Sequence, residues 1–480
     1  MKGGARTIGL VAGPVLAGAM LLAGAPEGLS FAAWGTAALL VLMATWWATE
    51  AIPIPATSLL PLFVLPLIEA GTPRQVGADY ANYIVLLLLG GFIIAMGIER
   101  WDLHKRIALN VISRVGAAPK ALIFGFMLAT GLLSMWISNS ATTLMMMPIA
   151  LSAAHSLGDK SGRFATALLL GICYAASIGG VATPIGTPTN LIAIKWLETE
   201  MGATIGFPQW MAFGIPAAAL LVPVAWWVVT RALPRFEGGH VVLEQVRREK
   251  HAMGRMSQPE QRVAIVFGVV ALLWVSRQWS VQLLDFLGWG VLAQYGGAEV
   301  DMMIAIIGAV VMFLVPAGAG SGRALLTWQE AERLPWGVLV LFGGGIALGN
   351  AVSRTGLSEW LGSQLAVMQS FPPILFVAVV VALVIFLTEL TSNVATMTTL
   401  APILGALAVA VGMAPSSLLG PAAVAASCAF MLPVATAPNA IVYSTGHIAV
   451  GDMIRHGFRI NLIGIGVITL IGYWIAPLVL

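Results

Sequence analysis

The chain has 480 residues, of which 59% are hydrophobic and only 9% are charged. An ordinary soluble domain carries about 25% charged residues, so this composition excludes a soluble globular protein and predicts a helical membrane protein. The formal net charge of +3 is small. The basic residues are spread over many loops, which excludes nucleic acid as a partner.

Apolar segments long enough to cross roughly 30 Å of hydrocarbon recur along the whole chain. We predict an all-α polytopic membrane protein with about eleven transmembrane helices and two re-entrant helical hairpins. The predicted spans are 6–24, 30–49, 54–70, 80–99, 162–190, 207–233, 262–283, 301–316, 336–352, 416–446 and 457–479. A cleaved signal peptide is an alternative interpretation of the first span, because Lys2 and Arg6 lie at its start and an apolar run follows.

The predicted hairpins are the apolar stretches 121–157 and 372–413. Their lengths are ambiguous, since one span needs about 20 residues and two need about 40 plus a turn. Two full spans would place the polar centre of each stretch at the far membrane surface. A helix–turn–helix that reaches mid-depth fits better, and non-helical backbone is tolerated there when it is buried in protein or lines water.

The basic residues also predict the orientation. With a cytoplasmic N-terminus and both hairpins re-entering their own side, twenty of the 24 Lys and Arg residues fall on the cytoplasmic side. The positive-inside rule gives such a bias for a correct topology. We therefore expect the N-terminus in the cytoplasm and the C-terminus outside, with 234–261 as a cytoplasmic linker.

A short polar phrase occurs at the centre of both hairpins, 254 positions apart. It reads Ser138-Asn139-Ser140-Ala141-Thr142 in the first and Ser392-Asn393-Val394-Ala395-Thr396 in the second. Polar side chains are costly at membrane depth unless they line a cavity or bind something. The duplication therefore predicts two halves that meet at one binding site, as in a transporter.

The order of elements around the phrase is also repeated. Each copy has a Gly-rich span, a charged surface helix, the hairpin and a span broken by proline. In the first copy the span, surface helix and break are 86–97, 100–115 and 181–190. In the second copy they are 339–349, 353–368 and 434–439. The charge distribution gives the two copies opposite orientations. We therefore predict an inverted repeat, on which alternating-access transporters are commonly built.

The hairpin tips offer neutral oxygen atoms and free helix N-termini. Hydroxyl and amide oxygens can replace the hydration shell of Na⁺, and the candidates are Ser134, Ser138, Asn139, Ser140, Thr388, Ser392 and Asn393. Proline breaks free backbone carbonyls near Gly186 and Ala435 that can complete each shell. Helix N-termini suit a carboxylate or another oxyanion. The alternative is that small polar residues only hold helices together.

Other polar residues in the apolar segments have structural interpretations. Glu389 could tune a cation site, take part in proton coupling or pair structurally, and we favour a supporting role. Lys195 is expected to reach the outer membrane interface. Cys173 and Cys428 are interpreted as small buried residues. We find neither a nucleophile with a base nor metal-ligand spacing, so we expect no enzyme activity and no organic cofactor.

Taken together, these motifs resemble the divalent anion/sodium symporter family, which carries dicarboxylates, citrate or sulfate with Na⁺. The resemblance covers nearly the whole chain and implies an elevator-type homodimer in a bacterial inner membrane. It implies the following division: scaffold spans with the first interfacial helix at 1–120, transport unit at 121–233, linker at 234–261, scaffold spans with the second interfacial helix at 262–371, and transport unit at 372–480.

By position, the resemblance also assigns ligands. The first sodium site takes Ser134, Ser138, Asn139 and the backbone of Gly186, and the second takes Thr388, Asn393 and the backbones of Thr391 and Ala435. The substrate site takes Ser138, Asn139, Ser140, Thr187, Pro188, Ser392, Asn393, Val394, Thr436 and Ala437. Two of these depart from the family pattern: Ser140 replaces Thr and keeps the hydroxyl, whereas Val394 replaces Thr and loses it.

The leading hypothesis is a secondary active symporter that couples inward Na⁺ to import of C4-dicarboxylates such as succinate, malate and fumarate. The alternatives are an Na⁺-independent dicarboxylate or citrate exchanger and a sulfate symporter, since a tetrahedral dianion can use the same donors. A more remote alternative is an anion channel, which would need a continuous polar pore.

Overall fold

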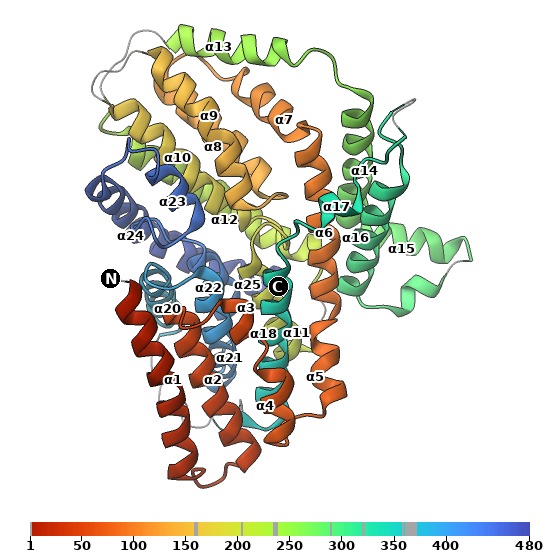
Figure 1. The fold of residues 1–480 in the computed structure, drawn as a ribbon, viewed down its shortest axis with the longest axis vertical. Helices are drawn as coiled ribbons and strands as arrows, with labels where there is room; N and C mark the ends of the chain where they lie inside the picture. Colours follow the sequence, from red (N-terminus) through yellow and green to blue (C-terminus); the bar gives the residue numbers. More distant parts are fainter. Residues whose placement is uncertain are drawn as a thin grey trace.

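The computed structural model describes residues 2–157, 162–202, 205–233, 239–288, 290–318, 322–357, 360 and 372–480. This part of the chain is built of α-helices (Figure 1), and 10 of its helical segments are long and apolar enough to cross a membrane. The predicted all-α polytopic class is confirmed.

The helices of the first half are α1 (Lys2–Ala23), α2 (Phe31–Thr49), α3 (Ile54–Thr57), α4 (Pro61–Leu67), α5 (Pro73–Tyr80), α6 (Tyr83–Arg100), α7 (Leu103–Ile112), α8 (Pro119–Ser134), α9 (Asn139–Leu157), α10 (Arg163–Gly180), α11 (Pro188–Met201), α12 (Phe207–Thr230) and α13 (Gly239–Ala252). Those of the second half are α14 (Gln258–Val275), α15 (Arg277–Phe286), α16 (Gly297–Leu314), α17 (Trp328–Ala331), α18 (Trp336–Arg354), α20 (Pro373–Thr388), α21 (Asn393–Ala410), α22 (Ser416–Ala426), α23 (Ala437–Tyr443), α24 (Val450–Trp474) and α25 (Ala476–Val479).

Most predicted spans coincide largely with single membrane-length helices, but 262–283 runs from α14 into α15, and two others are assembled from shorter helices. The predicted span 54–70 forms two short helices, α3 and α4. Pro61 begins α4, since proline is accommodated in the first turn of a helix. The predicted span 416–446 is α22 and α23 with a break between them. The first predicted surface helix contains α7, whereas most of the second, 353–368, lies outside the described residues.

The predicted hairpins are the antiparallel pairs α8–α9 and α20–α21. Their first helices have 16 residues each, about 24 Å at 1.5 Å per residue, which is less than the bilayer core. The serines of the duplicated phrase accept hydrogen bonds at the start of each second helix: Ser138 Oγ from the Ala141 N–H at 3.3 Å, and Ser392 Oγ from the Ala395 N–H at 3.1 Å. Such caps satisfy donors that a helix start leaves unpaired.

An asparagine holds each broken helix by the same pattern of hydrogen bonds. The Asn190 amide donates to the carbonyls ten and seven residues earlier, at 3.0 and 2.7 Å. Asn439 donates to the carbonyls ten and seven residues before it, at 2.9 Å each. These amides satisfy carbonyls that the break frees, so each break has a fixed shape.

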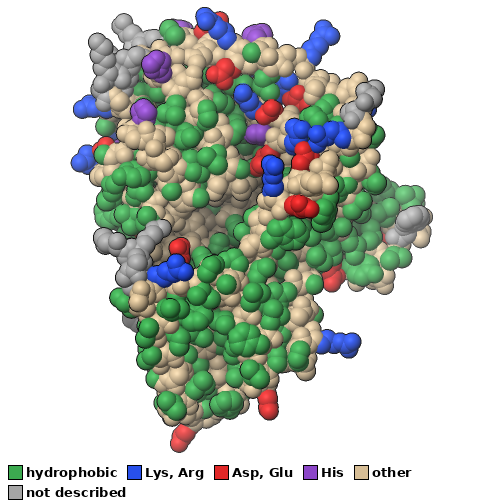
Figure 2. All heavy atoms as spheres, in the orientation of Figure 1, with side chains coloured by type: hydrophobic (Ala, Val, Ile, Leu, Met, Phe, Trp, Pro, Cys, Tyr) green, Lys and Arg blue, Asp and Glu red, His purple; other side chains and the backbone are tan. Residues whose placement is uncertain are grey.

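Segments rich in Lys and Arg lie at one end of the molecule, called here the basic end and formed by 100–120, 231–233, 239–262 and 323–333. Arg106 of the first loop pairs with Glu260 and donates to the Gly254 carbonyl at 2.9 Å. In Figure 1, α13 crosses this end above α7, α8 and α9, and in Figure 2 most Lys and Arg on the visible face lie here. The clustering agrees with the predicted charge bias.

Candidate functional site

Both hairpin tips and both helix breaks line one cavity of about 970 Å³. The two copies of the duplicated phrase, far apart in sequence, therefore meet in the fold. Of the predicted ligand residues, those that line the cavity are Ser138, Asn139, Ser140, Gly186, Thr187, Pro188, Ser392, Asn393, Val394, Ala435, Thr436 and Ala437. The surface in Figure 2 is hollowed between the upper and lower parts of the visible face.

Two predicted ligands lie just behind the tips, where they orient the asparagines. The Ser134 hydroxyl lies 2.7 Å from both Asn139 Oδ1 and the Ala176 carbonyl. The Thr388 hydroxyl repeats this arrangement at 2.9 Å, with Asn393 Oδ1 and the Ala426 carbonyl. Both hydroxyl residues are fully buried. A hydroxyl has one proton and two lone pairs, so rotation lets each of them face a cation instead.

Thr391, whose backbone carbonyl is a predicted ligand, is anchored by its side chain. Its hydroxyl pairs with that of Thr396 at 2.6 Å and donates to the Leu387 carbonyl at 3.0 Å. These bonds fix the turn between α20 and α21 from the side-chain side.

Oxygen atoms of the first tip and the first break converge at Gly180. A methyl group built on Gly180 would lie 2.6 Å from Asn139 Oδ1 and 3.1 Å from the Gly186 carbonyl oxygen. A methyl on Gly186 would lie 2.4 Å from the Gly180 carbonyl and 3.0 Å from that of Met135. Only glycine allows this approach. The result is a cluster of neutral oxygens, which is the ligand type that hard cations prefer.

Glu389 holds the second break from behind. Its carboxylate is 3% exposed and accepts a hydrogen bond from the Asn461 amide at 2.8 Å. It also accepts from three consecutive backbone N–H groups at 2.7–3.2 Å, those of Phe430, Met431 and Leu432. Leu432 lies three residues before Ala435, so these contacts anchor the backbone that leads into the second break. A supporting role for Glu389 in a cation site stays a prediction.

The cavity reaches the surface at the basic end, where charged residues that the sequence did not assign to it form the mouth: Glu99, Arg100, Glu330 and Arg333. Glu330 binds Arg100 at 2.7 Å and Arg323 at 2.8 Å. Burial acts to raise the pKa of Glu330, but hydrogen bonds from Arg323, Arg100 and Thr327 outweigh it and lower this pKa to about 2. Arg100, Arg323 and Glu330 therefore form a cluster of ion pairs at the mouth, called here the ionic frame.

Ser177 is a cavity residue that sequence reasoning missed. It is 1% exposed and lines the cavity beside Asn139 and Gly186, and within the described part of the chain its hydroxyl has no hydrogen-bond partner. A buried polar atom without a partner is costly and marks a place for a ligand. Its counterpart is Ser427, by the same spacing of 250 residues that relates Ala176 to Ala426. The structure supplies this spacing through the carbonyls that Ser134 and Thr388 contact, so the sequence alone gave no signal for Ser177.

A polar cavity built from paired hairpins and broken helices, inside a bundle of membrane-length helices, defines a multi-pass membrane transporter. Residues 5–480 match the family model described as the sodium:sulfate symporter transmembrane region, and the chain belongs to this family.

Characterised relatives match the chain over nearly its whole length. The chain is 40% identical to the sodium-dependent dicarboxylate transporter SdcS of Staphylococcus saprophyticus and 42% identical to that of Staphylococcus aureus. In both comparisons the match covers 99% of this chain and 92% of the relative.

Two solved structures share the fold. MtrF of Neisseria gonorrhoeae, reported within a class of antimetabolite efflux pumps, has a TM-score of 0.63 at 14% identity over 98% of both chains. The Alcanivorax borkumensis YdaH transporter has a TM-score of 0.60 at 17% identity, over 93% of this chain and 98% of its own. At these identities the similarity concerns the fold alone.

Proposed function

We propose that the chain is a sodium-coupled secondary active symporter that imports C4-dicarboxylates such as succinate, malate and fumarate. The observation that carries this proposal is the meeting of both hairpin tips and both helix breaks in one cavity. The family match and the relatives named as sodium-dependent dicarboxylate transporters support the same substrate and coupling ion.

In this proposal two sodium ions are held by the tips. Neutral oxygens of the first tip and break form one site, and those of the second form the other; the ligands are Ser134, Ser138, Asn139 and the Gly186 carbonyl, and Thr388, Asn393 and the carbonyls of Thr391 and Ala435. The dianion is bound between the tips by the Ser-Asn pairs and the helix N-termini. Sodium ions next to the carboxylates balance their charge without a buried arginine.

We further propose that the protein works as an elevator. The hairpins and broken helices form a transport unit that moves against scaffold spans, and the two halves are an inverted repeat. With the N-terminus in the cytoplasm and the C-terminus outside, the basic end faces the cytoplasm, so the conformation described here is open inward. Scaffold spans would form the contact of a homodimer in the cell membrane.

Uptake of labelled succinate into proteoliposomes tests the coupling. We expect uptake when the outside solution contains Na⁺ and near-complete loss when K⁺ or choline replaces it. Uptake that persists unchanged without Na⁺ would instead identify a sodium-independent exchanger.

The same assay tests the substrate class. We expect unlabelled malate and fumarate to compete with succinate, because all three place two carboxylates at similar separation. Citrate and sulfate should compete weakly. Strong competition by sulfate alone would show that the cavity selects a tetrahedral dianion.

A further inference from the structure

The end of the molecule away from the cavity mouth is closed by the same helices that line the cavity. Along α6, the cavity residues run from Phe92 to Arg100, whereas Tyr83 starts the helix at its other end. Along α11, Pro188 lies in the cavity and Glu198 lies near the far end. At 1.5 Å per residue, α6 spans about 27 Å, so the two sets of residues face opposite ends of the pathway.

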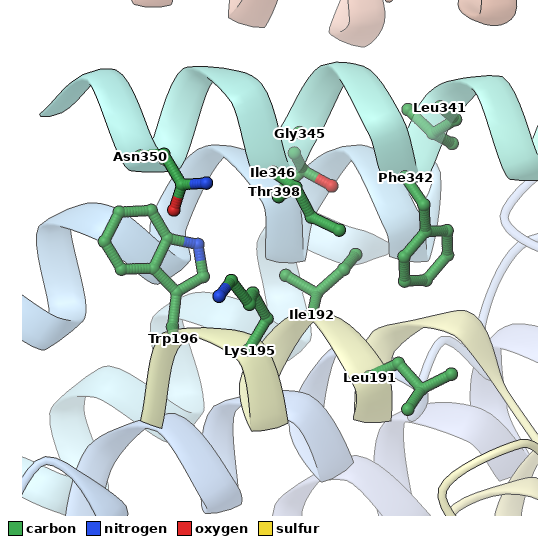
Figure 3. Close-up of a pocket in the computed structure, with 11 residues that line it drawn as sticks. Leu191, Ile192, Lys195, Trp196, Leu341, Phe342, Gly345, Ile346, Asn350 and Thr398 are labelled. Carbon is green, nitrogen blue, oxygen red and sulfur yellow. The ribbon is translucent and has the colours of Figure 1, made fainter. Parts of the chain in front are cut away.

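Between these ends, α11 packs closely against α18. Figure 3 shows the contact, with Ile192 and Trp196 of α11 facing Phe342 and Ile346 of α18. The remaining void has a volume of about 20 Å³, which is room for about one water molecule. Ile192 is 8% exposed. This mainly apolar layer, whose void Lys195, Asn350 and Thr398 also line, is called here the seal. It lies between the cavity residues and the far ends of α11 and α18.

Small residues of α18 make the seal tight. A methyl group on Gly349 would lie 2.6 Å from the Trp196 ring, and one on Gly345 would lie 2.9 Å from Thr398 of α21. In the proposed elevator, α18 belongs to the scaffold, while α11 and α21 belong to the transport unit. The seal therefore lies on the surface along which the two units would move.

A polar contact joins the same two units beyond the seal. The Tyr83 hydroxyl of α6 donates a hydrogen bond to Glu198 Oε2 of α11, and Glu198 Oε1 accepts from the Ile205 N–H at 3.1 Å. Lys195, one turn before Glu198, places its ammonium group 5.9 Å from the centre of the Tyr83 ring. On the scaffold side, Asp79 is already occupied by Asn350 at 2.6 Å.

We propose that Tyr83, Glu198 and Lys195 form a latch that holds the far-side seal shut while the cavity is open at the basic end. This inference rests on the proposed elevator mechanism. Movement of the transport unit would separate α11 from α6, so the hydrogen bond must break before the seal can open. The latch thus sets the rate at which the transporter leaves this conformation, whether or not substrate is bound. Its residues do not contact the substrate.

Thiol labelling of the seal tests the latch. A cysteine at position 192 (Ile192→Cys) is hidden while the seal is closed, and the native Cys173 and Cys428 are buried, which keeps the background low. An impermeant maleimide is added outside intact cells that express the full chain. In the Ile192→Cys protein we expect Tyr83→Phe to speed labelling about 10-fold, because the side-chain hydrogen bond between α6 and α11 is lost.

Two further variants make the result specific. Glu198→Gln keeps an acceptor for the tyrosine hydroxyl, so its effect should be smaller than that of Tyr83→Phe. Tyr473→Phe is the control. It removes a phenolic hydroxyl near the C-terminal end of α24, away from the contact between the two units, and should leave labelling unchanged.

Succinate uptake is measured on the same cells, so that a folding defect is recognised by lost transport. Equal labelling of Tyr83→Phe and its parent, with sodium-dependent uptake intact in both, would overturn the latch and leave the proposed function standing. Loss of sodium dependence in the parent would overturn the function itself.

Discussion

At the scale of single residues, the proposed first sodium site depends on a residue that has no side chain, Gly180. Asn139 Oδ1 and the Gly186 carbonyl approach the α-carbon of Gly180 so closely that a methyl group there would lie 2.6 and 3.1 Å from them. Helix interiors disfavour glycine by about 1 kcal/mol relative to alanine. Gly180 at the end of α10 therefore contributes space for oxygens rather than helix stability.

Gly180→Ala should weaken sodium binding selectively. The added methyl pushes the Asn139 amide away from the Gly186 carbonyl, and forced overpacking costs typically about 1–3 kcal/mol. That corresponds to a rise of roughly 5- to 140-fold in the Na⁺ concentration that half-saturates succinate uptake. The measurement is uptake as a function of external Na⁺, and at saturating Na⁺ the rate should recover in large part.

Gly131→Ala is the matched control, because Gly131 also lies in a helix of the transport unit but its added methyl would have no atom closer than 3.7 Å. It should leave the sodium dependence unchanged. If both variants showed the same shift, the effect would come from the helices and not from an ion at Gly180.

Residue identities at the tips were predictable, since polar atoms at membrane depth stand out in an apolar sequence. The cavity contains Asn139 and Asn393 as the duplicated phrase predicts. Ser177 was not found, because a lone serine in a helix has many structural explanations. Nor does a sequence show that Tyr83 meets Glu198, 115 residues away.

At the scale of elements, the mouth of the cavity joins the end of α6 to α17. Glu330 accepts from Arg100 and Arg323, and it also caps α17 through Thr327. The Arg100 and Arg323 guanidinium groups both lie over the Trp101 ring, at 4.8 and 5.8 Å. One carboxylate thus connects two helices and the loop between α16 and α17.

The stability that Glu330 provides should disappear in acid. Its pKa is lowered from 4.5 to about 2 in the folded protein, so its contribution is present above the unfolded pKa and is lost as the pH falls from about 4.5 to about 2. We expect Glu330→Gln to lower the apparent melting temperature of the purified protein at pH 7, by a loss of about 1 kcal/mol. The difference from the parent protein should shrink steadily below pH 4.5.

The neighbouring Glu332 gives a control for this experiment, since it is exposed and its side chain takes no part in the ionic frame. Glu332→Gln should melt like the parent at every pH. A difference between Glu330→Gln and the parent that stayed constant down to pH 2.5 would show that the carboxylate is not held ionised by the arginines.

Element boundaries could be predicted from span length, hydropathy and the positions of proline. Length and hydropathy gave the long spans, and proline placed the breaks in 181–190 and 434–439. The frame at the mouth was not predictable, because Arg100 and Glu330 come from segments 230 residues apart. Charged residues near a membrane surface are also usually solvated, which gives no reason to pair these two.

At the scale of the whole molecule, the decisive question is whether two bodies move past each other. The duplicated phrase predicted that distant segments meet, and they do so in one cavity. The division into scaffold and transport unit remains a proposal. It makes α18 and α21 members of different bodies, although they touch at Gly345 and Thr398 in this conformation.

A disulfide across that contact should stop transport. A β-carbon at position 345 would lie 2.9 Å from Thr398 Cγ2, within the range from which a disulfide with Cβ atoms about 3.5–4.5 Å apart can form. The pair Gly345→Cys and Thr398→Cys is oxidised in proteoliposomes, and succinate uptake is measured before and after reduction. We expect oxidation to abolish uptake and reduction to restore it, while purified oxidised protein still binds succinate in the open cavity.

The matched pair is Gly308→Cys and Val270→Cys, which joins α16 to α14 inside the scaffold, where a β-carbon at 308 would lie 2.6 Å from Val270. Oxidation of this pair should leave uptake intact, because both helices belong to one body. The comparison separates relative movement from general rigidity. Uptake that continued at full rate with the 345–398 disulfide formed would show that α18 and α21 move together, and the elevator division drawn here would be wrong.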